Sequence, residues 1–201
     1  IRLDSVGHTG GHFAFGIGAV YGCFTEIQGG LGGMKLTLRY TKSDGTTTAN
    51  DFFFNGDGKS SSNGGWVGIE YERDLAPTGG LGALLDRKWA HLVWVYDAAQ
   101  NKRHLYINGQ IMETDNLNNA PALATINGVT FDDSGAGADV IGKSLALGFA
   151  KDKMTTLWNG TPWGDYSLPG ANHYKGMMDD LRIWKSALTA AEVLELYNKE
   201  K

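Results

Sequence analysis

Residues 89–114, WAHLVWVYDAAQNKRHLYINGQIMET, carry the strongest fold signal in this chain. The dipeptide Asn108-Gly109 lies between two runs of β-forming residues. Asn-Gly supplies the two positive φ angles of a type I′ turn, so the stretch predicts a β-hairpin. The dense apolar run at 89–97 predicts a strand that is buried on both faces.

Short strand-like runs, separated by glycine, asparagine and aspartate, continue on both sides of this hairpin. Apolar and polar residues alternate in several of them, as in a strand with one buried face. We expect further strands at residues 34–41, 51–56, 65–74, 144–150 and 175–184.

A helix is expected only at the end of the chain. Thr189 can cap its first turn, and Glu192, three residues later, completes a capping box. The apolar side of this helix consists of Leu188, Val193, Leu196 and Tyr197.

The order of these elements indicates the fold class. Strands and helices do not alternate, which argues against a parallel βαβ sheet. Many strands, glycine-rich turns and one terminal helix predict an all-β fold, an antiparallel two-sheet β-sandwich with one short C-terminal helix. The 201 residues contain no internal repeat and no linker, so we expect a single domain over residues 1–201.

The composition excludes several classes of partner. The chain has 18 basic and 22 acidic residues, a net charge of -4, which argues against nucleic acid and anionic membranes. No apolar run reaches the roughly 18 residues of a membrane-spanning segment. Cys23 is the only cysteine, which excludes an internal disulfide and a cysteine-based metal site.

Three segments resemble, in the right order, laminin-G-like domains of the concanavalin A-like, pentraxin-related superfamily. Residues 89–114 resemble their central hairpin, with a Trp-x-His before one strand and LYINGQ after an acidic turn. YKGMMDDLRIWKSALTAAEVLELY at 174–197 resembles their closing strand and helix, and DFFFNGDGKSSSNGGW at 51–66 resembles an early loop. The resemblance implies a jelly roll of two curved antiparallel sheets. It also implies recognition of carbohydrate, as in lectins, or of protein outside the cytoplasm, sometimes with calcium.

The longest irregular segment, LWNGTPWGDYSLPGANHY at 157–174, is rich in aromatic residues. An aromatic ring offers an apolar face to the C–H patches of a sugar. We therefore expect the carbohydrate site here, with the alternative that one or both tryptophans cover the end of the core. The candidate binding residues are Trp163, Tyr166, Trp158, Asn159 and Asp165.

Two places have the oxygen-rich chemistry that calcium prefers. The loop NGDG at 55–58 offers the side chains of Asn55 and Asp57. The second place is Asp179, within the strand expected at 175–184.

Asp179 lies on the same strand face as Leu181 and Ile183, so its carboxylate enters the core if that face is the buried one. A buried carboxylate needs hydrogen-bond donors or a cation, and the sequence leaves both solutions open. Structural calcium is the only cofactor considered, and none is required.

The segment IEYERD at 69–74 is the one that suggests catalysis. Glu70 and Glu72 lie two apart on one strand face, where neighbours are about 6–7 Å apart, near the roughly 5 Å between the carboxylates of retaining glycosidases. The solvated outer face of an edge strand explains them equally well.

We therefore expect a non-catalytic recognition module that binds carbohydrate. We expect it to be secreted or on the cell surface and to be part of a larger protein. An adhesion or structural module that contacts a neighbouring protein domain is the second hypothesis. A glycoside-cleaving enzyme that uses Glu70 and Glu72 is the third.

Overall fold

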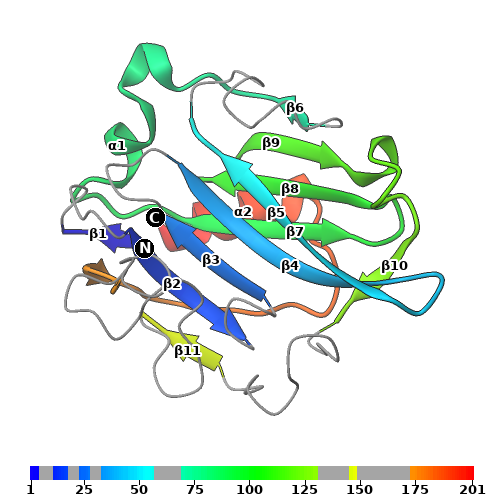
Figure 1. Cartoon of the computed structure of the whole chain (residues 1–201). Coiled ribbons are helices and arrows are strands. Elements are labelled where there is room, and N and C mark those ends of the chain that lie inside the picture. Colours follow the sequence, from blue (N-terminus) through cyan, green and yellow to red (C-terminus); the bar gives the residue numbers. More distant parts are fainter. Residues whose placement is uncertain (5–10, 18–22, 28–32, 57–68, 131–144, 149–172) are drawn as a thin grey trace. The chain divides into compact units, whose positions relative to one another are not determined.

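The computed structural model describes residues 1–4, 11–17, 23–27, 33–56, 69–130, 145–148 and 173–201 (Figure 1). The chain divides into two compact units, each assembled from separate stretches of sequence. The expectation of a single domain stays a prediction. Unit 1 comprises residues 1–4, 54–126 and 176–201, and unit 2 comprises residues 5–53 and 127–175.

Unit 1 contains a four-stranded antiparallel sheet in the order β6-β9-β8-β7. Its strands are β6 (Ile69–Tyr71), β7 (Leu92–Asp97), β8 (Lys102–Ile107) and β9 (Gln110–Asn116). A second, antiparallel pair joins β1 (Arg2–Leu3) to β12 (Gly176–Met177). The helical elements are η4 (Ala76–Thr78), α1 (Gly80–Leu85), η5 (Leu117–Asn119) and α2 (Ala190–Glu200).

The predicted hairpin is confirmed as β8 and β9. Asn108 and Gly109 have φ angles of 53° and 74°, as a type I′ turn requires. The backbone N–H of Asn108 donates to the carbonyl oxygen of His91 at 2.8 Å, and the Asn108 side-chain oxygen accepts from the His91 N–H at 3.0 Å. The turn is thereby tied to the residue that precedes β7.

The expectation that the run at 89–97 is buried on both faces is wrong. β7 is an edge strand of its sheet, and most of its side chains are only half-buried. Trp89, just before the strand, is 52% exposed. The apolar composition of the run shows that it forms a strand but not where that strand lies in the sheet.

The terminal helix begins as the sequence predicts. The Thr189 hydroxyl accepts from the N–H of Glu192 at 3.3 Å, and the Glu192 carboxylate accepts from the N–H of Thr189 at 2.7 Å. This reciprocal pair is the predicted capping box. Val193 of α2 is fully buried against Val95 and Tyr106 of the sheet, which attaches the helix to β7 and β8.

The strand expected at 175–184 forms only at Gly176–Met177. Asp180 has a left-handed φ of 49°, which ends the extended path, and residues 179–187 are exposed. The face of Asp179 is therefore not a buried one, so the condition under which its carboxylate would enter the core is not met.

Unit 2 contains a six-stranded sheet in the order β10-β4-β3-β2-β11, with β5 paired to β4. Its strands are β2 (His12–Ile17), β3 (Cys23–Ile27), β4 (Met34–Lys42), β5 (Thr47–Phe54), β10 (Ile126–Val129) and β11 (Leu145–Leu147). The sequence predicts β4, β5 and β11 but not β2, β3 or β10.

A glycine explains how β2 and β3 pack. The rings of Phe13 and Phe24 stack with centroids 6.1 Å apart. A Cβ atom on Gly16 would lie 2.8 Å from the Phe13 ring and 2.9 Å from Cβ of Phe24. Glycine at this position therefore makes room for the aromatic pair.

Unit 1 buries three charged residues on neighbouring strands. Arg103 and Glu113 are fully buried, and Asp115 is 3% exposed. Arg103 pairs across the sheet with Asp115, and its Nε donates to the Asp115 carboxylate at 3.1 Å. Both carboxyl oxygens of Glu113 are buried without a hydrogen-bond partner. Burial, and then repulsion by Asp115, raises the pKa of Glu113 to about 9, against the opposing effect of Arg103.

The predicted all-β class is confirmed. The strand pairs whose register is defined are antiparallel, consistent with a β-sandwich. Among the described residues α2 is the longest helix, with 11 residues, whereas α1 has six and was not predicted. None of the described helices has the length and hydrophobicity needed to cross a lipid bilayer.

Candidate functional site

Three adjacent strands of unit 2 bring polar side chains together on one face of its sheet. Glu26 of β3 lies opposite Lys35 of β4 in the strand register. Thr37 follows two residues later on β4 and so points to the same side. Its hydroxyl donates to the carboxylate of Asp51, on β5, at 2.5 Å. Strand alternation and pairing thus assemble the cluster.

Lys35 is the centre of this cluster. Its Nζ lies 3.7 Å from the Glu26 carboxylate and 3.6 Å from the Asp51 carboxylate. It also lies 5.0 Å from the centroid of the Phe24 ring, within the range of a cation–π contact. Two carboxylates and a ring together hold the ammonium group in one place.

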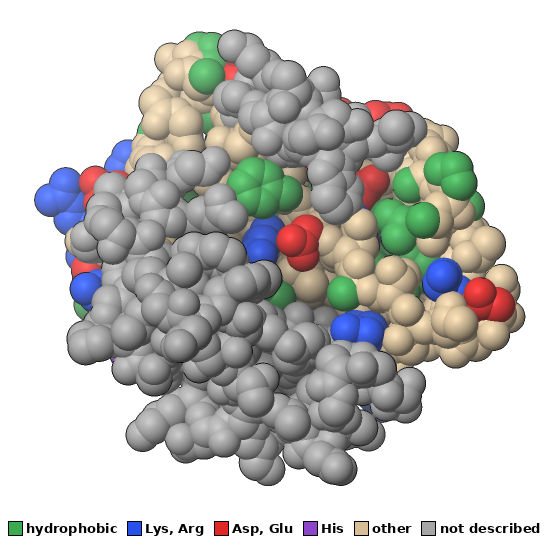
Figure 2. All heavy atoms as spheres, viewed as in Figure 1, with side chains coloured by type: hydrophobic (Ala, Val, Ile, Leu, Met, Phe, Trp, Pro, Cys, Tyr) green, Lys and Arg blue, Asp and Glu red, His purple; other side chains and the backbone are tan. Residues whose placement is uncertain are grey.

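The cluster is accessible from one side. The side chain of Asp51 is 43% exposed and that of Lys35 is 19% exposed, whereas Glu26 is 8% exposed. Figure 2 shows basic and acidic side chains side by side near the middle of the view, over β4 and β5 of Figure 1. Glu26 therefore anchors the cluster from below, and Asp51 presents it to solvent.

The same face continues along β4 and β5 with mixed chemistry. Phe53 lies two residues beyond Asp51 on β5 and is half-buried. In the other direction, the Arg39 guanidinium donates to the Thr47 hydroxyl at 3.2 Å. An aromatic ring, two cations, a carboxylate and hydroxyl groups therefore share this face of the sheet.

This set of groups has the chemistry to bind hydroxyl-rich molecules. A sugar hydroxyl both donates and accepts hydrogen bonds, so it can bond a carboxylate and an ammonium group at once. An aromatic ring nearby can cover the apolar C–H patch of the sugar ring.

The aromatic loop predicted from the sequence is not the site described here. Trp158, Asn159, Trp163, Asp165 and Tyr166 lie outside the described residues. Their role in carbohydrate binding stays a prediction.

The end of this loop is attached to the sheet of unit 2. The N–H of Tyr174 donates to the carbonyl oxygen of Gly148 at 2.7 Å. The N–H of Lys175 donates to Nδ1 of the buried His12 at 3.2 Å.

The predicted calcium ligands are only partly described. Asp57 lies outside the described residues, and Asn55 lies just after β5. Asp179 is exposed and accepts a hydrogen bond from the N–H of Asp180 at 2.9 Å. Within the described part of the chain, no three histidine, cysteine, aspartate or glutamate side chains are arranged to hold a metal ion. Calcium stays a prediction.

The acidic pair considered for catalysis lies at the edge of the unit 1 sheet. Glu70 belongs to the edge strand β6, Glu72 follows its end, and both are exposed. Asp74, the next acidic residue, accepts a hydrogen bond from the N–H of Ala76, the first residue of η4. The solvated outer face that the sequence offers as an alternative fits these positions.

The residues of the unit 2 cluster were not among the site residues expected from the sequence. Alternation along 34–41 places Lys35 and Thr37 on one face, and Asp51 opens the run DFFFNG. The pairing of these strands with β3 has no signal within any one of them.

No family model and no curated protein matches the chain. Among solved structures the chain is similar to an S-layer domain-containing protein (residues 221–444) from Clostridium thermocellum, with 18% sequence identity and a TM-score of 0.35. The similarity covers 98% of this chain and 66% of that one, so the chain spans just under two thirds of that structure. A similarity this low carries no argument about fold or function.

Proposed function

We propose that this chain is a non-catalytic recognition module that binds carbohydrate through the face of β3, β4 and β5 in unit 2. The observation that carries the proposal is Lys35, held between Glu26 and the exposed Asp51. The resemblance of three sequence segments to laminin-G-like domains supports the same function. It also supports a location on the cell surface or outside the cell.

The chemistry of the cluster favours binding over bond cleavage. Glycoside hydrolysis needs one carboxyl group that keeps its proton as a general acid. Here both carboxylates face the same ammonium group within 4 Å. Charged groups of opposite sign, held this close together, are suited to bonding sugar hydroxyls as donors and acceptors.

The test is a glycan array probed with the labelled protein, once with calcium and once with a chelator. The variant Asp51→Asn keeps the size of the side chain and removes its charge. Because a hydrogen bond to a charged group contributes about 1.5–3 kcal/mol, we expect binding to the best glycan to weaken about tenfold or more.

Asp44→Asn is the matched control. Asp44 is an exposed aspartate between β4 and β5, and it bonds Thr46 within its own turn at 2.9 and 2.6 Å. We expect this variant to bind as the unmodified protein does. Binding to no glycan, or equal binding by the two variants, would refute the proposal.

A second candidate function is adhesion to a protein partner. It is favoured by large apolar side chains on the surface of unit 1, where Trp89, Ile183 and Trp184 are 52%, 62% and 50% exposed. If no glycan binds and a neighbouring protein domain does, with loss of binding in Trp89→Ala, this second function replaces the first.

A further inference from the structure

The segment that joins β12 to α2 has the sequence of a strand, but it pairs with none of the strands that the structure describes. In Figure 1 it is the orange line between these two elements. Leu181 and Ile183 alternate with Asp180 and Arg182, the period expected of a strand. Within the described part of the chain, the amide and carbonyl groups of residues 181–187 form no main-chain hydrogen bonds.

This segment also exposes apolar surface. Leu181, Ile183 and Trp184 are 43%, 62% and 50% exposed. An exposed, unpaired run of β-forming residues is a template for pairing with a strand of another molecule.

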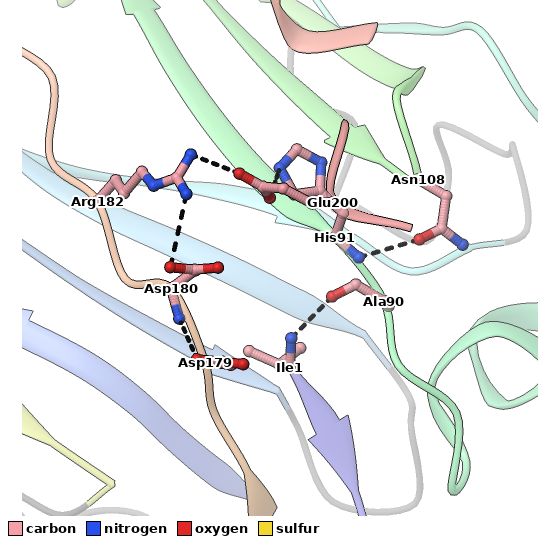
Figure 3. Close-up of polar contacts among 8 residues, drawn as sticks. All are labelled: Ile1, Ala90, His91, Asn108, Asp179, Asp180, Arg182 and Glu200. Atoms are coloured by element: carbon pink, nitrogen blue, oxygen red, sulfur yellow. Dashed lines mark hydrogen bonds and ion pairs between the residues drawn. The ribbon is translucent and has the colours of Figure 1, made fainter. Parts of the chain in front are cut away.

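Charged contacts fix the conformation of the segment in a single chain (Figure 3). Arg182 forms an ion pair with Glu200 and lies 3.5 Å from Asp180. Glu200 in turn lies 3.6 Å from His91. Burial lowers the pKa of His91, so this ring is neutral at pH 7 and Arg182 is the charged partner of Glu200.

Asp180 is the residue that keeps the segment from being extended. Its φ of 49° is left-handed, a conformation that costs energy for a residue with a side chain. Forming a strand through this residue would remove that cost.

We propose that residues 178–184 pair, as an antiparallel strand, with the same residues of a second copy of this chain. The argument for a second copy is charge complementarity. When two copies are paired about Leu181, Asp180 of each lies opposite Arg182 of the other, and Met178 lies opposite Trp184. Opposite charges and apolar pairs stabilise such cross-strand positions.

Neighbouring registers are less favourable. Pairing about Arg182 places two guanidinium groups opposite each other, and pairing about Asp180 does the same with two carboxylates. Like charges directly opposite each other destabilise a strand pair. Asp180 and Arg182 lie on the same face of the strand. In the register about Leu181, a two-fold axis places each of these two charges opposite a charge of the other sign.

The test is the mass of the protein measured by sedimentation and light scattering from micromolar to near-millimolar concentration. We expect a monomer that converts to a dimer as concentration rises. In the Asp180→Arg variant, the new arginine of each copy lies opposite Arg182 of the other, so like charges meet at two places. We therefore expect the dissociation constant of its dimer to be at least about tenfold higher. The double variant Asp180→Arg with Arg182→Asp exchanges the charges and should restore the dimer.

Glu195→Arg is the control, because Glu195 is an exposed carboxylate on α2 whose ion pair with Lys199 lies outside the segment. It should associate as the unmodified protein does. Circular dichroism checks that all variants are folded. A protein that stays monomeric at every concentration, a dimer that Asp180→Arg leaves unchanged, or a double variant that stays monomeric would overturn the proposal.

Discussion

Replacing Glu113 with glutamine removes a buried carboxyl group whose two oxygens have no hydrogen-bond partner among the described residues, and the effect on stability should depend on pH. The folded chain holds Glu113 in its protonated form up to a pKa of about 9, whereas the usual value is 4.5. Because the folded pKa is raised, the stability that this proton contributes is complete below pH 4.5. It is lost progressively as the pH rises towards 9.

The magnitude follows from the width of that window. Each pKa unit corresponds to about 1.36 kcal/mol. In the unfolded chain Glu113 has its usual pKa of 4.5, and pH 7 lies about 2.5 units above that value. Keeping Glu113 protonated in the folded chain at pH 7 therefore lowers the free energy of unfolding by on the order of 3 kcal/mol. Glutamine has nearly the same shape and does not ionise, so Glu113→Gln escapes this cost.

The assay is urea unfolding of both proteins at several pH values between about 5 and 8. The difference in the free energy of unfolding should grow in favour of Glu113→Gln by about 1.4 kcal/mol for each pH unit. Any fixed cost of burying the amide is the same at every pH and cancels from this slope. Glu70→Gln, at an exposed position of the neighbouring strand β6, should show no such slope. A difference that stays constant with pH, or that grows in favour of the unmodified protein, would refute the reasoning.

Three further changes test local features. Thr189→Ala removes the cap of α2 and should lower the free energy of unfolding, measured in urea, by about 1 kcal/mol. Thr189→Ser keeps a capping hydroxyl and should lose much less stability. Equal losses in the two variants would count against the capping box. Gly109→Ala should lower the stability more than Gly45→Ala does. Both glycines have a positive φ, but a Cβ on Gly109 would lie 3.0 Å from Leu194 and Tyr197, whereas a Cβ on Gly45 would meet nothing within 4 Å. We expect a difference of about 1 kcal/mol, and equal Tm values would contradict it. Burial raises the pKa of the Cys23 thiol to about 12 from 9.0, which lowers its thiolate fraction about a thousandfold. A thiol reagent should therefore react far more slowly with the folded chain than in urea, and equal rates would show an accessible thiolate.

The parts of the fold that were predicted correctly have signals within a few consecutive residues. Asn108-Gly109 dictates its turn through two positive φ angles, and Thr189 with Glu192 dictates the start of α2 through two hydrogen bonds. Neither feature needs a distant partner, so the sequence alone was enough.

The parts that were missed depend on residues far away in the chain. β7 has the composition of a central strand but lies at an edge, and its place is decided by which strands pair with it. β2 was not expected because Gly16 weakens the strand pattern, although the glycine is what admits the Phe13–Phe24 pair. The glycines of α1 obscured that helix in the same way.

The candidate site was missed for the same reason. Glu26, Lys35 and Asp51 come from three strands, and only the register between those strands brings the charges within 4 Å of each other. The aromatic loop was the expected site instead, because its clustered tryptophans and tyrosines are visible in a single segment.

The pairing of β1 with β12 limits how early unit 1 can finish folding while the chain is being synthesised. Arg2 lies opposite Met177, which is 175 positions further along the chain. Ribosomes add about 5–20 residues per second, so β1 waits on the order of 10–35 seconds for its partner to be made. The hairpin of β8 and β9 closes within microseconds once both strands are available. Translation, rather than the search of the chain for its contacts, therefore fixes the earliest moment at which unit 1 is complete.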